Sequence, residues 1–439
     1  MDAGRDFRDP DRRARLQADG AAWHAGAREV SKPMPAARSL WSRLHLRERI
    51  RDRDTAVYGV LLIVALIWPM ATIYATGDTF LTSQAAHAGT WVLLAVGLNV
   101  VVGFAGLLDL GYAAFFAIGA YSYALFASFQ LASSPLHHAY HLPFWLMLFV
   151  GMFVAAAFGA ILGFPTLRLR GDYLAIVTLG FGEIVPQLFL NLDQWTGGIN
   201  AIGSIDQPSL PAWITGPWAG ANDIAIVKDF NFSFDPVAYY VLIVILIIGA
   251  VILVNNLHRS RLGRAWMAIR EDEVAAAAMG INTVTTKLLA FAIGASFSGF
   301  AGAYYGASFG LVSPDSFLFV VSVTVLVMVV LGGMGNIAGV IIGAIAIYFL
   351  LNSVLSSLPA NLQSLSNAIG LGWLNNSNGA WPGLSELAQR LQFLLYGLIL
   401  VLMMLLRPQG IFPSRIREQE LKHAVATEEE TVVEQAHAS

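Results

Sequence analysis

Long apolar segments constrain this chain more than any other feature of its sequence. A helix needs ~20 largely apolar residues to cross the hydrocarbon core of a membrane. The four clearest segments are residues 55–75, 142–164, 236–257 and 392–406. Six weaker or glycine-interrupted candidates lie at residues 82–102, 112–131, 173–192, 288–310, 318–331 and 338–358. With 56% hydrophobic and only 13% charged residues, the sequence predicts an all-α, polytopic transmembrane helix bundle of about ten spans, and of no fewer than about eight.

The placement of basic residues predicts the orientation of that bundle. Of the 26 Lys and Arg residues, 13 lie within the first 53 positions. Basic residues in short loops face the cytoplasm. A ten-span trace puts Arg168 and Arg170, the run from Arg259 to Arg270, and the tail after Arg407 on the same side as the N-terminus. We therefore expect both termini to be cytoplasmic.

Three regions follow from this trace. Residues 1–54 are expected to be a cytoplasmic extension, partly disordered or lying on the membrane surface through an amphipathic stretch at residues 40–50. Residues 55–413 form the transmembrane domain, and residues 414–439, which include three consecutive glutamates, form a solvated cytoplasmic tail.

The connector at residues 260–280 separates two confident spans. Strong helix formers run from Ala265 to Met279, and Gly280 is placed to end a helix. Trp266, Ile269 and Glu273 follow a spacing of i, i+3, i+7. Such a helix suits docking into a groove on another protein. An ordinary interfacial connector would carry the same pattern, and the residues alone leave these two alternatives open.

Polar groups and backbone breaks inside the apolar segments are candidates for a translocation path. Ionisable side chains in a membrane tend to face the bundle interior, and Glu183 is the best case. Irregular backbone at membrane depth is tolerated where it is buried in protein or lines a water-filled path. The candidate path residues are Asn99, Thr178, Glu183, Gln187, Gly332, Gly333 and Gly335. Two glycine ladders, at 298–310 and 335–343, instead indicate close helix packing.

Several chemistries are excluded by what the sequence lacks. There is no cysteine, and none of the four lysines follows a glycine as a phosphate-binding loop requires. The chain is therefore not itself an ATPase, and we expect no catalytic residue, cofactor or metal site. His137, His138 and His141 cluster in a predicted outer loop, where we expect them to be solvated.

Six ordered blocks of sequence resemble those of LivM-type permeases of branched-chain amino-acid ABC transporters. They are GLLDLGYAAFFAIGAYSYA at 106–124, LRLRGDYLAIVTLGFGEI at 167–184, TGGIN at 196–200, GRAWMAIREDE at 263–273, VLGGMG at 330–335 and RPQGIF at 407–412. The resemblance runs from about residue 57 to residue 413 and is more specific than any single short motif.

The resemblance implies a permease subunit of an importer in a bacterial inner membrane. Its partners would be a second, LivH-type permease, two cytoplasmic ATPase subunits, a periplasmic substrate-binding protein and membrane lipid, with no nucleic acid. The connector at 263–280 would be the coupling helix that docks on the ATPase. The residues expected to make that contact are Gly263, Arg264, Ala265, Ile269, Arg270, Glu271, Asp272, Ala276, Ala277 and Gly280.

Departures from the family pattern leave the substrate open. The N-terminal extension is long, Ile199 stands where members commonly have proline, and a longer outer segment covers residues 361–390. Branched-chain or related small amino acids are the expected substrates, and urea, short amides or aromatic acids are the alternatives within the family. From other classes, an ion-coupled secondary transporter would need a midplane ion site, and only Glu183 could anchor one. A membrane-embedded enzyme would need convergent catalytic groups, which the sequence does not show.

Overall fold

The computed structural model describes a helical chain. The described residues are 57–74, 79–135, 137–138, 140–166, 172–208, 236–370, 372–375 and 383–406. The proposed amphipathic stretch at 40–50 and both tails lie outside them. One compact unit begins at Val64, while the unit Met1–Ile63 is described only in the helical residues 57–63.

The predicted spans all correspond to helices. Eight described helices are long and apolar enough to cross a membrane, and α4 is a shorter apolar helix. After a helix at Val57–Tyr74, the helices at the predicted spans are α3 (Phe80–Leu98), continued by the π-helix η1 (Asn99–Phe104), α4 (Tyr112–Phe126), α6 (Phe144–Thr166), α7 (Asp172–Asn191), α11 (Pro236–Arg259), α14 (Thr283–Phe309), α15 (Phe319–Gly332), α16 (Ile337–Phe349) and α18 (Leu384–Leu406). Of these, α4 and α18 are not among the eight. The prediction of a polytopic all-α bundle is confirmed.

Helix α14 occupies the centre of the bundle and packs on α3, α4 and α6. Its small residues allow this contact, because a Cβ atom at Gly302 would lie 2.6 Å from Ala120 N on α4. Ser298 is also buried, and its hydroxyl donates to Tyr112 O. The first predicted ladder is therefore a packing surface, except at Gly310, which ends α14 with φ +66°.

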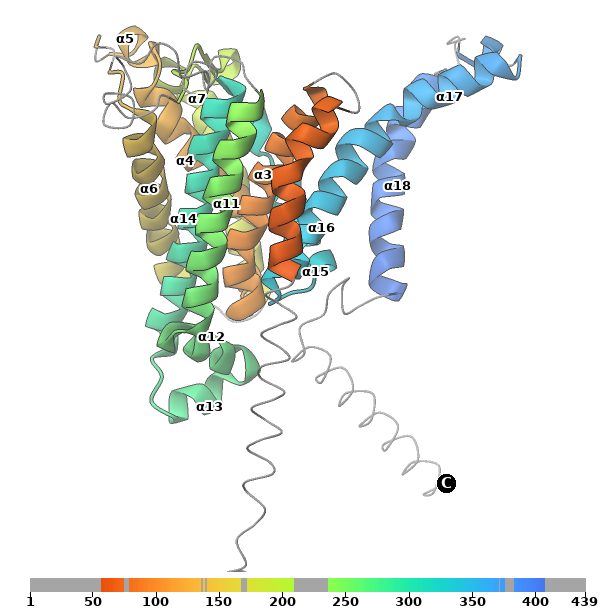
Figure 1. Cartoon of the computed structure of the whole chain (residues 1–439). Helices are drawn as coiled ribbons and strands as arrows, with labels where there is room; N and C mark the ends of the chain where they lie inside the picture. The colour runs from red at the N-terminus through yellow and green to blue at the C-terminus, as the bar shows by residue number, and fades with distance from the viewer. Residues whose placement is uncertain are drawn as a thin grey trace, which may run out of the picture. The chain divides into compact units, whose positions relative to one another are not determined.

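The predicted outer segment 361–390 is partly helical. Helix α16 continues through the π-helix η5 (Leu350–Leu355) into α17 (Ser356–Ala368), and the short helix η6 (Gly372–Asn375) follows. Figure 1 shows α17 and α18 as neighbouring helices joined at their ends. The helical segment that contains the span predicted at 338–358 therefore continues ten residues beyond its predicted C-terminal end.

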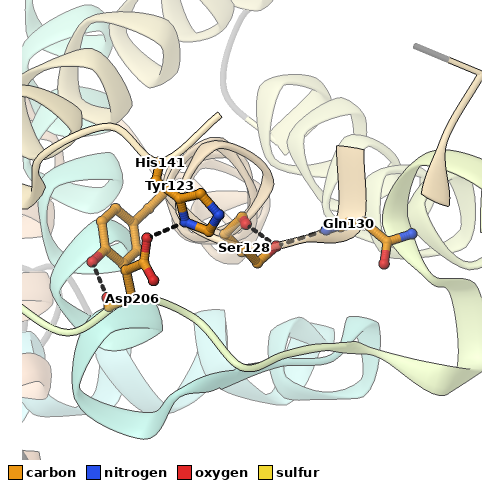
Figure 2. A network of polar contacts seen from close by, with 6 residues as sticks. Tyr123, Ser128, Gln130, His141 and Asp206 are labelled. Atoms are coloured by element: carbon orange, nitrogen blue, oxygen red, sulfur yellow. Dashed lines mark hydrogen bonds and ion pairs between the residues drawn. The ribbon is translucent and has the colours of Figure 1, made fainter. Parts of the chain in front are cut away.

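The end of the bundle that carries α5 (Gln130–Ser133) is fastened by polar contacts (Figure 1). Two short strands, β1 (Ile202–Gly203) and β2 (Leu311–Val312), pair antiparallel with Ile202 opposite Val312. Figure 2 shows Asp206 between two partners: its carboxylate lies 2.5 Å from His141 Nδ1, and its carbonyl accepts from Tyr123 OH. His141 is thus paired with Asp206 rather than simply solvated.

Candidate functional site

The predicted connector helix is two helices. Helix α12 runs over Arg261–Glu271 and α13 over Glu273–Ala278. Between them Asp272 has an extended backbone, and its Oδ1 accepts hydrogen bonds from Val274 N at 2.8 Å and Ala275 N at 3.0 Å. The prediction of one continuous helix over 265–279 is wrong, because Asp272 caps a new helix instead of extending the first.

Helix α12 is anchored to the bundle by its apolar face. Trp266 is fully buried, and its indole Nε1 donates to Thr286 O of α14 at 2.7 Å. Ile269, three residues further along α12, is also buried, with 5% of its surface exposed. The i, i+3 spacing seen in the sequence therefore points into the protein itself and not toward a partner.

Helix α13 is tied to α14 by charge. Glu273 Oε1 lies 2.6 Å from Lys287 Nζ, and the lysine side chain is largely buried. Asn282 caps α14 by accepting from Thr285 N at 3.1 Å. The two helices and the start of α14 are thus one connected structure at the end of the bundle opposite α5 (Figure 1).

The burial of the predicted contact residues separates them into two groups. Gly263, Ile269 and Ala276 are buried, and Ala265 and Arg270 are half-buried, so these side chains serve contacts within the chain. The exposed ones are Arg264, Glu271, Asp272, Ala277 and Gly280.

Two exposed apolar side chains on this surface were missed by the sequence reasoning. Val274 is 75% exposed and Met279 is 84% exposed. Their sequence signal was present, since they are the largest apolar residues around an alanine run. Only the turn at Asp272 establishes that both face away from α14. Large apolar side chains on a polar end of a membrane bundle indicate a protein contact.

The predicted path residues differ in burial and lie on several elements. Thr178 is buried and its Oγ1 accepts from Leu110 N at 3.1 Å, so it anchors the segment before α4. Asn99 is buried in η1, and the glycine residues 332, 333 and 335 form the turn between α15 and α16. Asn99 Oδ1 accepts from Gly335 N at 2.9 Å, which brings those two regions together.

Glu183 and Gln187 lie elsewhere, on the surface of α7. Both are exposed, and they are one helical turn apart, with Asn191 a turn further on. Glu183 is the twelfth of the 20 residues of α7. The expectation that Glu183 faces the interior of this chain is wrong: its carboxylate is near the middle of a span but on the outside of the chain.

A further carboxyl group lies in the segment between η1 and α4. Asp109 is 1% exposed, and its Oδ1 accepts from Gly111 N at 2.9 Å. Burial raises the pKa of Asp109 from 3.8 to about 7, and the hydrogen bond from Gly111 partly opposes that shift. No group of three or more His, Cys, Asp or Glu residues suited to a metal ion occurs within the described ranges.

The long apolar helices define a multi-pass membrane protein. A profile for the family described as "Branched-chain amino acid transport system / permease component" matches residues 80–404. The chain belongs to this family of branched-chain amino acid permease components.

The relatives agree with that assignment. The chain is 39% identical over 375 residues to the high-affinity branched-chain amino acid transport system permease protein LivM of Escherichia coli (strain K12), covering 84% of this chain and 77% of the relative. It is 26% identical to LivH of Salmonella typhimurium, covering 58% of this chain and 79% of that relative. No solved structure matches the chain.

Proposed function

We propose that this protein is a LivM-type permease subunit of an ATP-driven importer of branched-chain amino acids in a bacterial inner membrane. The relatives that carry the name LivM are permeases of branched-chain amino acid transport systems, and they match most of this chain. The chain is a transporter component and not an enzyme. Its matches to both LivM and LivH proteins indicate a pair of related permeases.

The exposed surface of α12 and α13 is the observation that carries ATP coupling. Trp266 and the pair of Glu273 with Lys287 fix the helices to α14, while Val274 and Met279 remain outward. Exposed apolar side chains close in the sequence to exposed charged ones suit docking into a groove on a partner protein. In the proposed complex that partner is a cytoplasmic ATPase subunit, one of two, and a periplasmic binding protein delivers the substrate.

Reconstitution tests this function directly. Proteoliposomes would hold this chain, the second permease and the ATPases, with binding protein on the outside and ATP inside. We expect uptake of leucine, isoleucine or valine that requires ATP. Uptake by this chain alone, driven by an ion gradient and indifferent to ATP, would establish a secondary transporter instead. Selective ligand binding of urea, an amide or an aromatic acid by the binding protein would reassign the substrate.

The charge-reversed variant Glu271→Arg tests the docking surface. Glu271 is exposed at the end of α12, and its reversal leaves the internal contacts of Trp266 and Lys287 in place. We expect weaker co-purification of the ATPase with a normally inserted permease. Reversal of Arg270 is a poorer test, because the Arg270 guanidinium also donates to Gly103 O within the chain. Undiminished capture and uptake in Glu271→Arg would count against this surface.

The α7 face of Glu183 and Gln187 is the proposed path lining. A carboxylate near mid-span is unfavourable against lipid by at least ~2.5 kcal/mol. A second permease covering this face would enclose it in a water-filled path, where the carboxylate attracts the ammonium group of an amino acid. We expect Glu183→Gln to reduce uptake by about tenfold, as for loss of one charge-assisted hydrogen bond. Ile184→Val, at the adjacent exposed position, is the matched control and should transport normally.

A further inference from the structure

The π-helix η1 lies between the connector helices and the turn joining α15 to α16. On one side it contacts Arg270 of α12, whose Nη1 donates to Gly103 O at 2.5 Å. The stem of Arg270 also lies against Gly106, which has φ +69°, and a Cβ atom there would be 2.8 Å from Arg270 Cγ. Both the charged end and the aliphatic stem of Arg270 are therefore held by the segment at the end of η1.

The same turn of η1 contacts the α15–α16 turn on its other side. Asn99 Oδ1 accepts from Gly335 N at 2.9 Å, and Asn99 is completely buried. Gly103 permits this approach, because a Cβ atom at Gly103 would lie 2.7 Å from Gly335 N. Gly103 thus takes part in both contacts. Its carbonyl accepts the hydrogen bond from α12, and its lack of a Cβ atom leaves room for Gly335 N.

Helices α15 and α16 are packed closely enough to move together. A Cβ atom at Gly332 would lie 2.6 Å from the Cα of Val340, and one at Gly343 would lie 2.6 Å from the Cα of Gly332. Backbone contact of this kind leaves little room for the two helices to slide past each other. A displacement of Gly335 is therefore passed to both helices.

Structural stability alone does not account for an amide at position 99. Asn99 Nδ2 is buried and has no hydrogen-bond partner among the described residues. An unpaired buried donor is unfavourable, and an apolar side chain of similar size would remove that penalty. The hydrogen bond from Gly335 to Asn99 Oδ1 is the contact that such a replacement would lose.

We infer that Asn99 is a positioning residue that latches the α15–α16 turn to η1, so that movement of α12 at Arg270 reaches these two membrane helices. A π-helix is a suitable link, because its wider turn can repack locally without unfolding the helix. This role rests on the proposed ATP-driven import, in which α12 follows the ATPase.

The test uses Asn99→Leu in the complete transporter, reconstituted in proteoliposomes with both permeases, the ATPases and the binding protein. Uptake and ATP hydrolysis are measured together, with the melting temperature of the purified complex. We expect substrate moved per ATP to fall at least about fivefold, as for loss of one hydrogen bond, while hydrolysis stays within about twofold. The melting temperature should change little, since removal of the unpaired Nδ2 offsets the loss of the acceptor for Gly335 N.

Thr90→Val is the matched control. Thr90 lies in α3, the helix that continues into η1, and is 2% exposed. Its hydroxyl is buried and has no hydrogen-bond partner among the described residues. Its replacement also removes one buried polar atom but breaks no hydrogen bond of the latch. Substrate moved per ATP should remain at the wild-type value in this variant.

Gly103→Ala is the second variant, for use if Asn99→Leu does not assemble. Its added methyl group would lie 2.0 Å from Asn99 Oδ1 and 2.7 Å from Gly335 N, so it would force the latch apart and should lower uptake per ATP in the same way. Unchanged uptake per ATP in an assembled variant would overturn the latch. A parallel loss of uptake, hydrolysis and melting temperature would do the same, since it shows a purely structural role. If the wild-type complex shows no ATP-driven uptake, the proposed function fails and not the latch alone.

Discussion

Asp109 is a buried carboxyl group whose protonation is linked to folding. Its pKa is raised to about 7 in the folded chain, well above the ordinary value of 3.8. Between those values the folded state binds more protons than the unfolded state, so stability falls as the pH rises. The destabilising effect of the buried Asp109 carboxylate is absent at pH values below the unfolded-state pKa of 3.8, and it is fully present at pH values above the folded-state pKa of about 7.

Replacement of Asp109 by asparagine should flatten this dependence. Asn keeps an oxygen that can accept the hydrogen bond from Gly111 N, and it cannot ionise. We expect the melting temperature of the wild-type complex to fall between about pH 4 and pH 7, and that of Asp109→Asn to fall less. Thermal unfolding in detergent at several pH values measures the difference. Parallel curves for the two proteins would contradict the assigned burial.

Individual residue types were predictable from the sequence, but their directions were not. Glu183 was recognisable as an expensive group in a span, and the structure places it on the outer surface of α7. Ile269 was recognised by its spacing, and it points inward. Helical periodicity identifies a face without saying what covers it, and that depends on which helices pack together in three dimensions.

Helix boundaries were likewise predicted from the sequence only in part. Hydropathy placed the spans because apolar length is a local property, and α11 begins at Pro236 as expected. The break at Asp272 was missed although aspartate is a favoured N-cap, because alanine-rich sequence on both sides predicts one helix. The continuation of α16 into α17 depends on packing against α18, which is not a local property.

Trp266 should prove essential for holding α12 to α14. Trp266→Ala would remove a fully buried indole and its hydrogen bond to Thr286 O, a loss of ~3–5 kcal/mol at a typical core position. We expect a lower melting temperature and weaker ATPase capture by the variant. Trp373→Ala, at a position 65% exposed in η6, is the matched control and should change neither. Equal behaviour of the two variants would show that Trp266 does not anchor α12.

The orientation of the molecule was predicted from its segregated charge. The α12–α13 end and the α5 end lie at opposite ends of the bundle (Figure 1), so the two faces can be labelled separately. A natural chain without cysteine is well suited to this experiment, because every introduced thiol is unique.

Single cysteines at two exposed positions should distinguish the faces. Ile199 is 82% exposed in η2 (Gly198–Asn200), and Ala278 is exposed in α13. In intact cells whose outer membrane has been made permeable, an impermeant thiol reagent should label Ile199→Cys. It should label Ala278→Cys only after the inner membrane is opened. The reverse pattern would contradict the predicted orientation of the bundle.

The break at Asp272 also bears on how partners could be exchanged. Helix α12 buries Trp266 against the permease body, and α13 keeps the ion pair of Glu273 with Lys287, whereas Val274 and Met279 at the two ends of α13 are exposed. Under the proposed function, sequence changes at these two exposed positions would alter which ATPase is recognised while the contacts of Trp266 and Glu273 stay in place. Related permeases could then acquire or share an ATPase partner through a few surface substitutions, without redesign of the membrane domain.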